Sequence, residues 1–199
     1  MKRYWLIGIV SVFFTPLVDA TTLERDLGRG LVYKRVAQVP DDLPVRSQAP
    51  AIVLDLRYAS GEDIREWLFM YAAPQTPIFV LANMTTQKTF RQSMQGVSGS
   101  ITIGIAGEDF APDIALNMTE EEEKRAYEAL NLTDEINTLL YPATHKERYD
   151  EAAMVKACNE TRKTVTEPQA DAQAAAPIID QAILRAVQIH RGWLVLRSG

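Results

Sequence analysis

Two apolar runs, residues 51–56 and 78–82, constrain the fold more than any other feature of this chain. Each run follows a proline and is almost continuously apolar, with little alternation between polar and apolar residues. Such runs are typical of parallel strands that are covered on both faces. Parallel neighbours need a long connection, which is usually a helix. Segment 50–86 therefore predicts a βαβ unit and an α/β fold.

The connection between these runs has the periodicity of an amphipathic helix. We expect this helix at residues 62–72, where large apolar side chains recur at i, i+3, i+4 and i+7. These side chains are Ile64, Trp67, Leu68 and Tyr71. The charged residues between them should face water, so this helix should cover one face of the sheet.

Weaker patterns extend the unit in both directions. We expect further strands at residues 30–39, 101–105 and 112–116, and a second helix at residues 86–95. After Thr119 the pattern becomes helical, with expected helices at 120–130, 133–141, 146–163 and from 177 onward, and a flexible connector at 164–176. The chain is thus predicted to consist of stacked βαβ units with a helical C-terminal half.

Residues 1–20 have the layout of a secretory signal peptide. Lys2 and Arg3 precede an apolar stretch, and Val18, Asp19 and Ala20 form a small-residue cleavage site. The apolar stretch is shorter than the roughly 20 residues of a membrane-spanning helix, although an uncleaved anchor is the alternative. We therefore expect a periplasmic or secreted protein that has no membrane association after cleavage.

The composition limits what the mature chain, residues 21–199, can do. Cleavage would change the formal net charge from −5 to −6, and no cluster of basic residues occurs, so nucleic acid is not an expected partner. The remaining 179 or so residues suit one domain. Cys158 is the single cysteine, which excludes an intramolecular disulfide, and we expect it to be a buried apolar side chain. Asn-x-Thr triplets at Asn83, Asn117, Asn131 and Asn159 fit glycan acceptors or, at two of them, helix caps.

Four segments together resemble the tail-specific (C-terminal processing) serine peptidases. Residues 50–61 resemble their strand and glycine turn, and residues 76–86 are similar to the next strand, which in the family ends just ahead of the nucleophile. Residues 110–117 and 180–191 resemble their closing strand and terminal helix, in the same order. The resemblance covers residues 30–191 and implies a single domain of the crotonase/Clp-protease type.

The catalytic residues that the resemblance implies are missing. In the family a serine two positions after a threonine attacks the peptide carbonyl, and a lysine about two dozen residues later removes its proton. Matching Thr85 to that threonine puts Gln87 at the nucleophile position, and no lysine occurs between Lys88 and Lys124. Gly61 stands alone where the family has paired glycines that stabilise the oxyanion. We therefore assign no catalytic residue.

A displaced nucleophile is the alternative within the enzyme class. Ser93, Ser98 and Ser100 are the hydroxyl candidates, and Lys88 is the candidate base. Lys88 and Ser93 are five residues apart on the expected helix, which puts them roughly 140° apart around its axis. This angle disfavours a serine and lysine pair.

Metal and cofactor sites are not expected either. His145 and His190 have no carboxylate at a zinc-ligand spacing, and no glycine-rich phosphate fingerprint occurs. The acidic run 120–123 fits a solvated helix start, because carboxylates are favourable at the positive end of a helix.

The predicted function is that of an exported, non-catalytic protein that binds peptides or serves as a scaffold. A vestigial cleft near Gly61, Asn83, Thr85 and Gln87 would hold an extended peptide or a segment of another exported protein by strand addition. The rival hypothesis is an active serine-type peptidase with a displaced nucleophile. A third hypothesis is a structural subunit that forms homo-oligomers through residues 119–163.

Overall fold

The structure is a computed structural model that describes residues 22–45, 51–73, 75–133, 136–141 and 178–198. The predicted signal peptide, Cys158, the expected helix at 146–163 and the connector at 164–176 lie outside the described residues. No helix among the described residues has both the length and the apolar character needed to cross a membrane.

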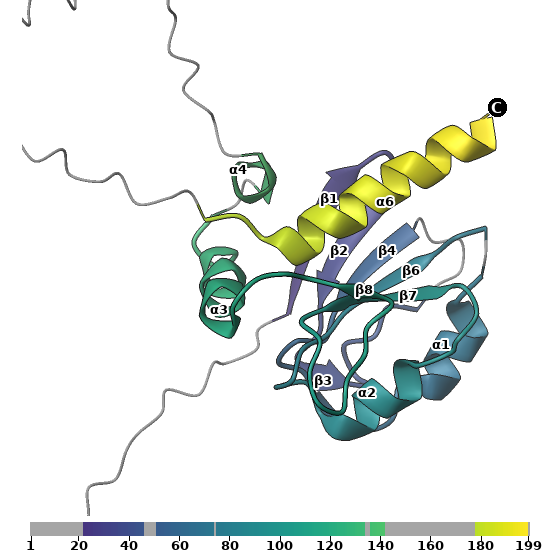
Figure 1. The fold of residues 1–199 in the computed structure, drawn as a ribbon. Helices are drawn as coiled ribbons and strands as arrows, with labels where there is room; N and C mark the ends of the chain where they lie inside the picture. Colours follow the sequence, from purple (N-terminus) through teal and green to yellow (C-terminus); the bar gives the residue numbers. More distant parts are fainter. Residues whose placement is uncertain (1–21, 46–50, 74, 134–135, 142–177, 199) are drawn as a thin grey trace, which may run out of the picture.

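A six-stranded, mostly parallel sheet forms the centre of the protein (Figure 1). Its spatial order is β1-β2-β4-β6-β7-β8. The strands are β1 (Leu23–Gly28), β2 (Leu31–Arg35), β4 (Ala51–Asp55), β6 (Ile78–Leu81), β7 (Ser100–Gly104) and β8 (Ile114–Ala115). Strands β1 and β2 are antiparallel, and every later neighbour is parallel. The predicted α/β class with parallel strands is confirmed.

Helices cover both faces of this sheet (Figure 1). Helices α1 (Arg65–Tyr71) and α2 (Lys88–Met94) lie on one face, and α4 (Ile136–Leu140) and α6 (Gln181–Ser198) lie on the other. Alternate residues of β4 enter the two cores: Val53 packs in the core with α6, whereas Leu54 packs in the core with α1 and α2. This double burial explains why the strand is continuously apolar.

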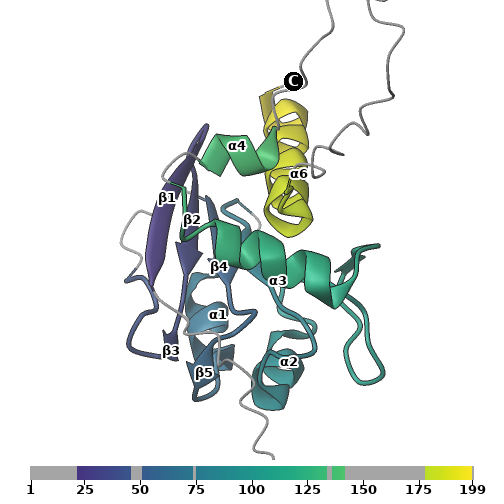
Figure 2. The same cartoon turned by 90° about the vertical axis from the view of Figure 1, so that its left-hand side faces the viewer.

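Helix α3 (Glu120–Ala129) lies at the carboxyl ends of the parallel strands. Figure 2 shows it between the two groups of helices, across the end of the sheet. Its capping box is present as the sequence predicts, because the side chain of Thr119 accepts the N–H of Glu122 and the side chain of Glu122 accepts the N–H of Thr119. Helix α3 therefore covers the end of the sheet that is formed by the carboxyl ends of the parallel strands.

Several predicted elements differ from the structure. The strand expected at 112–116 is reduced to β8, and α6 begins at Gln181 rather than at residue 177. The expected helix at 62–72 begins later, at Arg65, because the carboxylate of Asp63 accepts the Arg65 N–H at 2.8 Å in a local turn. The expected strand at 30–39 is interrupted after Arg35. Its end, β3 (Gln38–Val39), pairs instead with β5 (Ser60–Gly61) in a separate two-stranded sheet.

Strand β1 was not predicted from the sequence. It is an edge strand in which three consecutive charged residues, 24–26, lie between two leucines, and only Leu27 within it is buried. Gly28, Arg29 and Gly30 all have positive φ and form the tight connection to β2. A charged edge strand gives little hydrophobic signal, because one side of it faces water.

Candidate functional site

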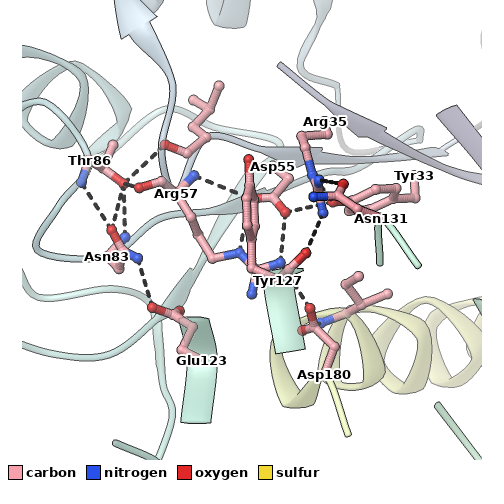
Figure 3. A network of polar contacts seen from close by, with 12 residues as sticks. Tyr33, Arg35, Asp55, Arg57, Asn83, Thr86, Glu123, Tyr127, Asn131 and Asp180 are labelled. Carbon is pink, nitrogen blue, oxygen red and sulfur yellow. Dashed lines mark hydrogen bonds and ion pairs between the residues drawn. The ribbon is translucent and has the colours of Figure 1, made fainter. Parts of the chain in front are cut away.

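Charged and polar side chains gather where the parallel strands end. Arg35 is the last residue of β2, Asp55 is the last residue of β4, and Arg57 and Asn83 follow β4 and β6 by two residues. The carboxyl ends of parallel strands are where open α/β folds bind their ligands. Figure 3 shows that these residues form one connected network with α3 and the start of α6.

Arg57 is the centre of the network. Its Nη2 donates to Asp55 Oδ2 at 2.7 Å and to Asp180 Oδ2 at 2.9 Å, and its Nε donates to Asp55 Oδ1 at 3.0 Å. The Arg57 and Asp180 side chains are each 1% exposed and that of Asp55 is 0% exposed. Asp180 also accepts the N–H of Ile183 at the first turn of α6. One buried arginine therefore fixes α6 to the end of β4.

The electrostatics of this triad favour the ionised forms. Burial acts to lower the pKa of Arg57, but the charges of Asp180 and Asp55 outweigh it and hold that pKa well above its ordinary value. Burial likewise acts to raise the pKa of Asp55, but the nearby Arg57 guanidinium holds it below its ordinary value. Both groups therefore stay ionised near neutral pH, so neither supplies a proton for acid catalysis, and the lowered pKa of Asp55 makes it a weaker base.

Arg35 connects β2 to α3. Its Nη2 donates to the carbonyl oxygen of Tyr127 at 2.8 Å, its Nη1 donates to Asn131 Oδ1 at 2.5 Å, and its guanidinium lies 3.8 Å from the centre of the Tyr127 ring. The hydroxyl of Tyr33 accepts from Arg35 Nε and donates to Asp55. Burial, and then the charge of Asp55, raises the pKa of Tyr33 well above its ordinary value. The C-terminal turn of α3 is therefore fixed onto the sheet.

Asn83 forms the turn after β6 and points into the protein. Its Oδ1 accepts the N–H groups of Thr85 and Thr86, both at 3.0 Å, and its Nδ2 donates to Glu123 Oε2 at 2.7 Å. The Thr86 hydroxyl accepts the Asn83 N–H at 2.9 Å and donates to the carbonyl of Leu56. Asn83 is only 3% exposed, so its side chain is not presented to a ligand in this structure.

The acidic start of α3 is only partly solvated, which corrects the interpretation of residues 120–123. Glu120, Glu121 and Glu122 are exposed, but Glu123 is 1% exposed and holds Asn83. Burial raises the pKa of Glu123, and the nearby Arg57 charge opposes that shift. Three buried atoms have no hydrogen-bond partner within the described part of the chain and belong to this region: Glu123 Oε1, Arg57 Nη1 and Tyr127 Oη.

The four predicted cleft residues have different surroundings. Thr85 and Gln87 are exposed, and the Thr85 N–H donates to Asn83 in the turn hydrogen bond. Gly61 lies in the small sheet, paired with Val39, at φ +127°. A Cβ at position 61 would lie 2.1 Å from the Val39 carbonyl oxygen, so this close approach requires glycine there.

The displaced-nucleophile candidates are not arranged for catalysis. Ser93 is 2% exposed, and its hydroxyl donates to the Phe90 carbonyl at 2.9 Å. Lys88 is exposed, and its ammonium lies 3.3 Å from a carboxylate oxygen of Asp109. Ser100 donates to the Val97 carbonyl, and Ser98 is exposed. Lys88 is thus paired with a carboxylate, and the hydroxyls of Ser93 and Ser100 are each held by a backbone carbonyl.

No cluster of metal-binding type occurs within residues 22–45, 51–73, 75–133, 136–141 and 178–198. His190 is buried against Phe79 and Trp193, and burial lowers its pKa. This residue is part of the apolar packing of α6 against the sheet.

Sequence reasoning missed the ionic network itself. Its central ions, Asp55, Arg57 and Asp180, occur within the segments 50–61 and 180–191 that carry the family resemblance, but nothing in their spacing shows that Arg57 and Asp180 meet. The available signal was the placement of charged residues at the ends of buried strands. A charge in such a place must be paired or reach water.

Comparison of the chain with models of protein families, with curated proteins and with solved structures found no match in any of the three. The resemblance to the tail-specific peptidases therefore stays a prediction.

Proposed function

We propose that the protein is an exported, non-catalytic binding or scaffolding protein, related to the tail-specific serine peptidases and of the crotonase/Clp-protease type. One observation supports this proposal above the others. At the carboxyl ends of the strands, the charged groups neutralise one another in a buried network and hold α3 and α6 in place.

Chemistry at this location would need a free nucleophile with a base beside it. The hydroxyl of Thr86 is engaged with backbone groups on both sides, and Gln87 carries an amide. Charges that stabilise a fold by mutual pairing are not free to take or give protons. Binding through the protein surface needs none of these groups, because strand addition uses backbone N–H and C=O groups.

The test combines a reactive probe with a binding assay. Purified mature protein, residues 21–199, is incubated with a fluorophosphonate probe and, separately, with a fluorescent, permanently unfolded polypeptide. We expect no covalent labelling, no cleavage, and an increase in the anisotropy of the polypeptide. Ser93→Ala and Ser98→Ala are the matched controls. Labelling or cleavage that disappears in either variant would establish a serine-type peptidase with a displaced nucleophile and refute the proposal.

Export and assembly are tested separately. Expression of the full chain followed by cell fractionation and N-terminal sequencing should find the mature protein outside the cytoplasm, beginning at Thr21. Light scattering measures the solution mass, and a mass of one chain would remove the hypothesis of a homo-oligomeric structural subunit. Full-length protein in the cytoplasm would refute the predicted signal peptide.

A further inference from the structure

A groove runs along the free edge of the sheet at β8, on the side of the N-terminal turns of α6. Its volume is about 520 Å³, and its walls include Ala115, Leu116 and Asn117 from the sheet edge and Leu184, Arg185 and Gln188 from α6. This volume is within the range of about 300–1,000 Å³ that is typical of ligand sites. None of the four predicted cleft residues lines it, so it is a different location from the vestigial cleft.

The sheet edge offers unpaired backbone groups to this groove. Within the described part of the chain, β8 is the last strand of the sheet and pairs with β7 alone. The N–H of Leu116 donates to the carbonyl of Gly104 in β7 at 2.8 Å. Because backbone groups of successive strand residues point to opposite sides, the N–H and C=O of Ala115 point away from β7, and Ala115 is exposed. These are the groups that an added strand would pair with.

The side chains of the groove supply both apolar contact and charge. Leu116 and Leu184 are half-buried and pack against the hydrophobic core between the sheet and α6. Arg185 is exposed, and its Nη1 donates to the neutral side chain of Gln188 at 3.3 Å. Arg185 has no ion pair with a carboxylate among the residues that the structure describes. Among the described residues, the groove therefore carries a positive charge without a carboxylate partner, beside the outer edge of β8.

We infer that the β8–α6 groove binds an extended peptide segment that carries an acidic side chain. The segment adds as a strand to β8 through Ala115, places an apolar residue against Leu116 and Leu184, and pairs its carboxylate with Arg185. This inference rests on the proposed binding function and specifies where the peptide lies and which chemistry it carries.

Two synthetic peptides test the inference on the mature protein. Both are fluorescent octapeptides of alternating valine and threonine with an amidated C-terminus, and they differ only in one central residue, glutamate or glutamine. Anisotropy titrations should show that the glutamate peptide binds about threefold more tightly, which is the effect of one exposed ion pair.

Three variants locate the binding. Ala115→Pro removes the outward N–H without removing a hydrogen bond to β7, which a strand edge tolerates, and it should weaken both peptides by about fivefold or more. Arg185→Gln should abolish the preference for glutamate while leaving the glutamine peptide unchanged. Arg125→Gln on α3, an exposed arginine outside the groove, is the control and should change neither. Circular dichroism confirms that each variant is folded.

The outcomes separate this inference from the proposed function. Binding of both peptides with equal affinity, or binding that survives Ala115→Pro and Arg185→Gln, overturns the groove as the site and leaves the binding function standing. Failure of the wild-type protein to bind either octapeptide also overturns the groove. Failure to bind the unfolded polypeptide of the earlier assay refutes the proposed function itself.

Discussion

Replacing Arg57 by methionine should destabilise the protein more than any other single change in the polar network. Methionine fills a similar volume but leaves Asp55 and Asp180 buried at 0% and 1% exposure with no cation between them. Removing one partner of a buried ion pair costs about 3–5 kcal/mol, and a domain of this kind has a total stability of about 5–15 kcal/mol. The single substitution should therefore remove a large part of the free energy of unfolding.

Urea denaturation followed by circular dichroism measures the effect. With a slope of about 2 kcal/mol per molar urea, the loss corresponds to a midpoint about 1.5–2.5 M lower than that of the wild-type protein. The triple variant Arg57→Met, Asp55→Asn, Asp180→Asn removes all three charges and should recover most of this loss. Lys88→Met breaks an exposed ion pair and should leave the midpoint unchanged.

The result that refutes this reasoning is specific. A midpoint for Arg57→Met within about 0.5 M of wild type, with an unchanged slope, would mean that the network does not stabilise α6 on the sheet. If Arg57→Met does not fold at all, Asp180→Asn replaces it. This variant retains an oxygen acceptor while losing one charge, and a midpoint equal to that of wild type would refute the role of the charge.

Three further predictions concern α3 and the turn after β6. Because the pKa of Glu123 is raised in the folded protein, its ionisation opposes folding, so the contribution of Glu123 to stability is greatest below its ordinary pKa of 4.5 and is lost as pH rises through the raised value. The free energy of unfolding of Glu123→Gln, measured in urea melts, should accordingly rise relative to that of the wild type between pH 4 and pH 7. If the difference between the two proteins is the same at every pH, the pKa of Glu123 is not raised. Asn83→Ala removes the side-chain hydrogen bonds to Thr85, Thr86 and Glu123 and should cost about 2 kcal/mol by the same assay, whereas Thr85→Ala, at an exposed side chain, should cost almost nothing. Thr119→Ala removes the helix cap of α3 and should lower Tm by about 2–4 °C in a thermal scan, and no change would show that α3 is held by tertiary contacts alone.

Local patterns predicted the central elements because each carries its own signal. The apolar runs at β4 and β6 are buried as expected, and three of the four residues of the predicted helix stripe, Ile64, Trp67 and Leu68, are buried, whereas Tyr71 is partly buried. The capping box at Thr119 is present. These features depend on residues within a few positions of one another, so a single stretch of sequence is enough to recognise them.

The candidate site was harder to predict, because its partners are far apart in the chain. Asn83 was expected to face a ligand, but its side-chain amide donates a hydrogen bond to Glu123, which lies 40 residues later in the chain. The run at residues 120–123 was interpreted as fully solvated. Which of its carboxylates is buried depends on how α3 packs against the sheet, and the local sequence does not show this. The edge strand β1 was not predicted, because its charged residues give it no apolar pattern.

The amino-acid sequence alone determined the α/β class, the parallel strands of the central unit and the absence of a serine at the position that the family resemblance marks. Tertiary structure alone decided that Arg57 meets Asp180 across 123 residues, and that the carboxyl ends of the strands are closed by α3. The physical reason is that periodicity and capping act over a few residues. The pairing of buried charges depends instead on which distant segments the fold brings together.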